Sequence, residues 1–118
     1  MYKLKVVTVL ITVLLSACVW ASELSMDTLS GEWEFLHWAE KETPEQTHKV
    51  GIVMDFKSDG TVLSEVGDKS VAEAFRIEGD TIIYTGKRGD QNWKLVSFVP
   101  GESMVVDNSG SIMTFRKK

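Results

Sequence analysis

The amino-acid sequence predicts an all-β domain, an eight-stranded antiparallel up-and-down barrel that follows an N-terminal signal segment. After residue 30, apolar and polar residues alternate with a period of two, which is typical of strands. Short clusters of Gly, Asp, Asn and Ser interrupt this alternation at regular intervals and indicate tight turns. No segment beyond the leader carries an amphipathic helix of four turns.

The alternation divides the chain into eight expected strands. Their ranges are Glu32–Ala39, Val50–Lys57, Thr61–Val66, Val71–Glu78, Thr81–Gly86, Gln91–Val99, Ser103–Asn108 and Ser111–Lys117. Beyond the second strand the connections are only two to four residues long, so successive strands are expected to pair as antiparallel hairpins. A meander of eight strands either closes into a barrel or exposes two edges, and closure is the simpler solution.

The expected first strand leads into the one long connection, Glu40–Lys49, which is polar and is expected at the mouth of the barrel. Trp33 and Phe35 share the inner face of this strand. By alternation Leu36 and Trp38 point outward or toward the mouth, unless a β-bulge near Phe35–Leu36 returns them to the core. An outward Trp38 would form an aromatic contact patch beside the acidic loop.

The leader supports a prediction about location. Two lysines precede an apolar run, and the segment ends in Leu15-Ser16-Ala17-Cys18, which resembles the bacterial lipobox. The resemblance implies lipid attachment at Cys18 and cleavage after Ala17. Under the enterobacterial sorting rule, Val19 in place of Asp after the cysteine directs the lipoprotein to the periplasmic face of the outer membrane, which is its expected location. The alternative is an ordinary signal peptide cut after Ala21, which would release a soluble periplasmic or secreted protein.

These boundaries divide the chain into a signal peptide with a lipobox (1–17), a spacer (18–29) and one domain (30–118). The leader holds two of the 13 basic residues, which leaves 11 against 17 acidic ones and a formal charge of −6 from Cys18 onward. This balance disfavours nucleic acid as a partner and makes the acyl anchor the expected membrane contact. With a single cysteine, the chain forms no internal disulfide.

Several segments resemble small bacterial lipocalin-like domains, and together they cover most of residues 29–117. They are Leu29-Ser30-Gly31-Glu32-Trp33, residues 54–61 (MDFKSDGT), residues 75–82 (FRIEGDTI), Trp93-Lys94-Leu95 and residues 113–116 (MTFR). The resemblance implies that Trp33 closes the barrel floor and that Arg116 lies over its indole ring, a structural pair. The chain lacks the Thr-Asp-Tyr motif of full-length lipocalins and is shorter than they are.

The interior of such a barrel is either filled by side chains or holds one small ligand. The bulky residues expected inside favour a filled or nearly filled barrel. They are Trp33, Phe35, Ile52, Met54, Phe56, Leu63, Phe75, Ile77, Ile82, Tyr84, Trp93, Leu95, Met104, Val106 and Phe115. The residues expected to contact a ligand or partner are Leu36, His37, Trp38, His48, Tyr84 and Trp93.

Catalysis is not expected, and neither is a cofactor or a metal. The spacing of His37 and His48 matches no zinc template, and no nucleophile or phosphate-loop motif is present. Two functions follow as expectations. The first is an envelope-tethered, non-catalytic lipoprotein that binds a small apolar ligand or an envelope partner. The alternative is a protein-interaction module with a filled barrel, such as an inhibitor or immunity protein.

Replacing the lipobox cysteine tests the predicted anchor. Cys18→Ala is expected to abolish acylation and to move the protein from membrane to soluble fractions, because no other lipid-attachment residue is available. Metabolic labelling with a fatty-acid analogue, followed by membrane fractionation, measures both effects. An unlabelled wild-type protein would contradict the predicted anchor.

Overall fold

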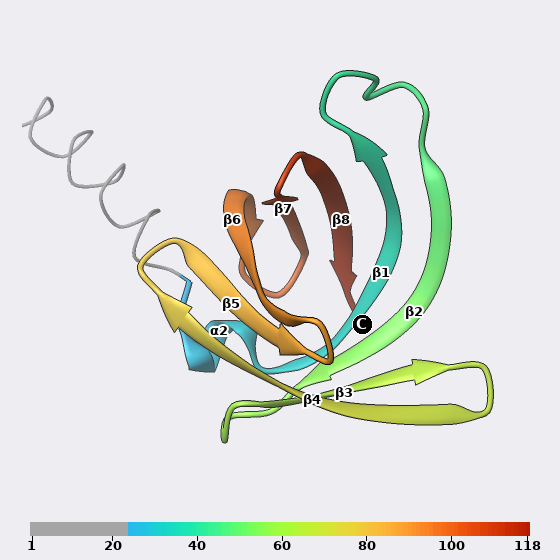
Figure 1. The fold of residues 1–118 in the computed structure, drawn as a ribbon. Helices are drawn as coiled ribbons and strands as arrows, with labels where there is room; N and C mark the ends of the chain where they lie inside the picture. The colour runs from blue at the N-terminus through green and yellow to red at the C-terminus, as the bar shows by residue number, and fades with distance from the viewer. Residues whose placement is uncertain (1–23) are drawn as a thin grey trace, which may run out of the picture.

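A computed structural model of the protein describes residues 24–118. The strands follow one another around a closed barrel, and each is antiparallel to its neighbours (Figure 1). One short helix, α2 (Met26–Leu29), precedes them. The strands are β1 (Gly31–Glu40), β2 (His48–Phe56), β3 (Thr61–Val66), β4 (Lys69–Glu78), β5 (Thr81–Gly86), β6 (Gly89–Val99), β7 (Ser103–Asn108) and β8 (Ser111–Lys117).

The predicted all-β barrel is confirmed, and each predicted strand lies within two residues of the observed one at both ends. Pairing of β8 with β1, from Trp33 opposite Lys117 to Glu40 opposite Ser111, closes the sheet. The predicted signal segment and Cys18 lie outside the described residues. Within residues 24–118, no helix is long and apolar enough to cross a membrane.

The floor of the barrel is built on Trp33, whose side chain is fully buried. Its indole Nε1–H donates a hydrogen bond of 2.8 Å to the backbone carbonyl of Leu29, at the end of α2. Carbonyls at the end of a helix lack intrahelical partners, so this bond satisfies one of them. Leu24 and Leu29 are also buried in the core. Residues 24–29, assigned to a spacer from the sequence, therefore pack as part of the folded unit.

The expected contact between Arg116 and Trp33 is wrong. The register of β1 and β8 places Arg116 opposite Glu34, and the Arg116 Nη2 donates to the Glu34 Oε1 over 2.8 Å on the outer surface. The Arg116 side chain is 64% exposed. Neighbouring residues of a strand point to opposite faces, so burial of Trp33 and Phe115 sends Glu34 and Arg116 outward.

Two β-bulges change which residues face inward. In β1, Phe35 pairs with Phe115 and His37 with Thr114, so Leu36 is an extra residue. The bulge returns Trp38 to the inner side, where it packs against the core half-buried, as the bulge alternative predicts, whereas Leu36 does not join the core. On the facing strand Gly51 adopts a φ of +76°, which glycine reaches without a Cβ clash and which accommodates the irregular β1–β2 pairing.

The second bulge lies in β6, where Leu95 pairs with Val106 and Ser97 with Val105. The extra residue, Val96, is 53% exposed, and Phe98 becomes buried against Trp33 at a ring-centroid distance of 6.0 Å. Simple alternation from Trp93 and Leu95 would place Ser97 and Val99 on the inner face, and the bulge places Phe98 there instead. A bulge shifts the period-two pattern by one residue, so every later side chain in the strand changes face.

Strand β3 also has the opposite phase to the one expected. Val62 and Ser64 are buried, whereas Leu63 is only half-buried and lies outside the core cluster. The register explains the difference, because Val62 pairs with Phe56 and Ser64 with Met54, both of which point inward. Directly paired residues share a face of the sheet. A small polar residue thus occupies an interior position that the sequence pattern assigned to a leucine.

A double-mutant cycle distinguishes the two placements of Arg116. The variants Arg116→Ala and Glu34→Ala are each expected to lower the free energy of unfolding by less than about 1 kcal/mol and to be coupled, because they remove one exposed ion pair. Trp33→Ala is expected to cost about 3–5 kcal/mol and to add to Arg116→Ala without coupling. Chemical unfolding monitored by circular dichroism measures each value. Coupling of Arg116 to Trp33 instead of Glu34 would contradict the observed register.

Candidate ligand cavity

The barrel is not filled. A cavity of about 280 Å³ lies inside it, at the end opposite α2, near the β3–β4 and β5–β6 turns. Its walls are mainly apolar and aromatic, and strands from most of the barrel contribute to them. The lining residues are Phe35, Ile52, Met54, Ser64, Val66, Val71, Glu73, Tyr84, Gln91, Trp93 and Met113.

The inverted phase of β3 explains why the expected filled interior is wrong. Ser64 faces the cavity and pairs with Val71 across the β3–β4 hairpin. A leucine in that inward position would occupy space that the serine leaves open. Val66 and Val71 continue the wall toward the turn and stay 50% and 37% exposed, so they form the rim of the cavity.

A continuous row of aromatic rings supports one side of the cavity, in which Tyr84, Trp93 and Phe35 line the cavity and Phe115 is fully buried. Tyr84 and Trp93 stack nearly parallel, with centroids 4.8 Å apart and planes at 7°. Trp93 lies 5.6 Å from Phe115, which in turn stacks on Phe35 at 4.8 Å. The row crosses β5, β6, β8 and β1. Each ring packs against the next, so this side of the cavity has a rigid apolar surface.

A carboxylate faces this apolar cavity. Glu73 is half-buried on the inner face of β4 and accepts a hydrogen bond from the hydroxyl of Tyr84 on β5. Gly86 on β5 makes room for it, since a Cβ at that position would lie only 2.7 Å from the Glu73 Oε2. Burial of Tyr84, together with its hydrogen bond to Glu73, raises the pKa of the tyrosine well above its usual value near 10, while Ser64 opposes this shift.

Gln91 is a second polar residue that lines the cavity. Its Oε1 accepts hydrogen bonds from the Trp93 Nε1–H at 3.1 Å and from the Asn108 Nδ2 at 3.0 Å. These contacts hold the indole ring of Trp93 in place and satisfy its N–H donor. Across residues 24–118, every buried side-chain nitrogen or oxygen has a hydrogen-bond partner.

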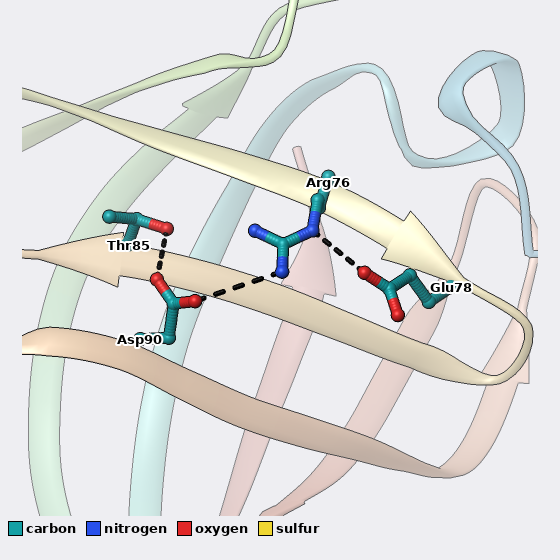
Figure 2. A network of polar contacts seen from close by, with 4 residues as sticks. All are labelled: Arg76, Glu78, Thr85 and Asp90. Atoms are coloured by element: carbon teal, nitrogen blue, oxygen red, sulfur yellow. Dashed lines mark hydrogen bonds and ion pairs between the residues drawn. The ribbon is translucent and has the colours of Figure 1, made fainter.

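The outer face of the same strands carries a polar network, shown in Figure 2. The Arg76 Nε binds the Glu78 carboxylate at 2.7 Å, and the Arg76 Nη2 lies 3.7 Å from Asp90, which also accepts the hydroxyl of Thr85 at 2.7 Å. The network joins β4, β5 and β6 behind the wall that holds Glu73, Tyr84 and Trp93. Its groups are exposed, so it contributes little stability.

The six residues expected to contact a ligand or partner lie in three places. Tyr84 and Trp93 line the cavity. Trp38 and His48 stack on each other, 4.4 Å apart, beside the β1–β2 loop and outside the cavity lining. Leu36 and His37 border a depression of about 520 Å³ on the β1–β2 surface at the bulge.

Sequence reasoning missed the three polar lining residues, Ser64, Glu73 and Gln91, and it did not include Val66, Val71 or Met113. The signal for Glu73 was present, since it alternates with Val71 and Phe75 on one face of its strand. No signal marked Ser64, because Leu63 was the more apolar choice beside it. In the described part of the chain, no group of three or more His, Cys, Asp or Glu side chains is arranged to hold a metal ion.

Comparison with known proteins identifies the fold alone. No protein-family model matches the chain, and no curated protein matches it. The crystal structure of an uncharacterized protein from Bacteroides eggerthii DSM 20697 has a similar fold, with a TM-score of 0.63 at 15% sequence identity. The similarity covers 75% of this chain and 98% of that one. The protein is thus a barrel of the same class as a bacterial protein whose role is not described.

The environment of Tyr84 gives a testable pH dependence. Below pH 10 the tyrosine is neutral in both the folded and unfolded states, so its titration does not affect stability. Above pH 10 the unfolded chain loses the proton while the folded protein keeps it, so stability falls as the pH rises. The wild type is expected to lose stability between pH 10 and 11 more steeply than Tyr84→Phe does, by at most about 1 kcal/mol after allowance for partial exposure.

Urea unfolding at both pH values measures this difference. A tyrosinate absorbance titration checks it independently, with Tyr84→Phe as the baseline. Ionisation of Tyr84 near pH 10 in the folded protein would contradict the observed burial and hydrogen bonding.

Proposed function

We propose that this protein is a non-catalytic binding lipoprotein of the bacterial envelope that holds a small apolar ligand inside its barrel. The observation that carries the proposal is the cavity of about 280 Å³ and its aromatic wall. An apolar cavity of roughly 150 Å³ in another protein binds benzene, so this one suits a ligand of one or two rings. Concave apolar sites with a few polar groups are typical of small-molecule binding.

The polar groups of the cavity support recognition more than reaction. Tyr84 holds its proton far above neutral pH and donates it to Glu73 in a hydrogen bond. A general acid or base works best when its pKa lies near the operating pH, and this tyrosine is far from that condition. The pair therefore suits orienting a ligand by hydrogen bonds.

The location in the proposal rests on the leader. The lipobox-like run that ends at Cys18 supports an acyl anchor, and Val19 supports the periplasmic face of the outer membrane. The acidic balance of the remaining chain gives no attraction to anionic headgroups, so the anchor would supply the membrane contact. Because Leu24 already packs in the barrel, an anchored domain would lie within a few residues of the bilayer surface.

A protein-interaction role is the alternative, and the depression on the β1–β2 surface is the feature that favours it. Leu36 and Val50 supply apolar surface there, with Glu34, His37 and Lys49 around them. An envelope inhibitor or immunity protein would bind its partner through this surface and would not need the cavity. Leu36→Asp would weaken that contact and leave ligand binding in the barrel intact, which separates the two roles.

Filling the cavity tests the proposed function. Ser64→Leu is expected to lower the affinity for a neutral two-ring probe, tryptophol, by about tenfold or more, because the added side chain occupies ligand space. The matched control is Ser70→Leu, which adds the same atoms at an exposed position of β4. Isothermal titration calorimetry on the full chain measures both.

Native mass spectrometry of the protein from its own host complements this measurement, because it detects a retained ligand directly. Equal affinity of folded Ser64→Leu and the wild type would place the probe outside the barrel. The absence of both a retained ligand and any probe binding would refute a ligand-binding function.

A further inference from the structure

We propose that the cavity selects ligands that carry a protonated amine or a similar cationic hydrogen-bond donor on a flat apolar body, and that it rejects carboxylates such as fatty acids. This inference rests on the proposed binding function and specifies its ligand class. The feature that carries it is the placement of Glu73 among the apolar lining residues.

The Glu73 carboxylate has capacity for a cationic partner. Its Oε1 accepts the hydroxyl of Tyr84, and its Oε2 lies beside Gly86. Two carboxylate oxygens offer about four acceptor positions, so one hydrogen bond leaves most of them available. Within residues 24–118 this carboxylate forms no ion pair with a lysine, arginine or histidine. A half-buried carboxylate in an apolar cavity attracts a positive group more strongly than one in water does.

Two other carboxylates of these strands differ from Glu73, because they form ion pairs with an arginine. Asp90 on β6 binds both Arg76 and Thr85, and Glu78 on β4 binds Arg76. These partners all lie on the outer face (Figure 2). Within residues 24–118 the hydrogen-bond partner of Glu73 is the neutral Tyr84, so the inner face of the same three strands carries a negative charge without an ion-pair partner.

The aromatic wall adds to this preference. Tyr84, the hydrogen-bond donor to Glu73, stacks directly on Trp93, and both rings line the cavity. The face of an aromatic ring attracts a nearby cation, and indole does so most strongly. A flat ring can pack along the same wall while its amine reaches Glu73. An anionic head at this position would meet like charge, and the chain as a whole is acidic as well.

A matched ligand series tests the inference on the full chain. Tryptamine, tryptophol and indolepropionate share the indole ring and a short arm, and they end in a cation, a neutral hydroxyl and an anion respectively. Tryptamine is expected to bind at least about tenfold more tightly than tryptophol at pH 7, and indolepropionate more weakly than both. Isothermal titration calorimetry measures the three dissociation constants.

Glu73→Gln is the diagnostic variant, because the amide oxygen still accepts the Tyr84 hydroxyl while the charge is lost. The ratio of tryptophol to tryptamine dissociation constants is expected to fall to about one in this variant. Glu65→Gln is the matched control, since it removes the same charge from an exposed, outward position of β3 and should preserve the ratio.

The outcomes separate this inference from the proposed function. Equal binding of tryptamine and tryptophol, or a preference that persists in Glu73→Gln, would overturn the amine selectivity while leaving a ligand-binding barrel intact. If none of the three compounds binds, the inference fails, and the proposed function fails with it where the protein from its host also retains no ligand. The wild-type ligand series decides selectivity by itself, so the test stands even where Glu73→Gln does not fold.

Discussion

Closure of β8 on β1 is the constraint on which the rest of this structure depends. Seven residue pairs join the two strands, from Trp33 with Lys117 to Glu40 with Ser111. Closure gives every strand two neighbours and leaves no sheet edge to pair with another chain. Closure also creates an interior. A domain of this size without a disulfide depends for its stability on the apolar side chains buried in that interior. The core, the floor and the cavity all follow from the closed sheet.

The closed sheet would place side chains by simple alternation, and two bulges modify that rule. Leu36 returns Trp38 to the inner side, and Val96 brings Phe98 against Trp33 at the floor. Both bulges add an extra residue to a strand that is longer than its neighbours, which lets the strand bend around the barrel. The floor is thereby packed tightly, whereas the opposite end keeps a serine and a carboxylate inside and remains open.

Glu73 is a charged residue at an inward position of the sheet, where an apolar residue would pack better. A carboxylate inside an apolar wall loses hydration, and the hydrogen bond from Tyr84 offsets only part of that cost. Folded proteins tend to keep such conflicts at functional sites, because a fully apolar residue would serve packing better. This conflict is a physical reason to propose a binding site at this end of the barrel. On the outer face of the same strands, by contrast, Arg76 forms ion pairs with Glu78 and Asp90.

The sequence by itself determined the all-β class, the eight strands to within two residues, the antiparallel meander and the buried Trp33, because period-two patterning and turn residues act locally. Tertiary structure decided which of two neighbouring residues faces inward wherever pairing register or a bulge intervenes. Leu63 and Ser64 exchange roles because Met54 and Phe56 fix the face of their partners on β3. Arg116 turns outward because its strand neighbour Phe115 is buried. The space beside Ser64 depends on the register of β3, which no local pattern contains, whereas the inward position of Glu73 follows the alternation of its own strand with Val71 and Phe75.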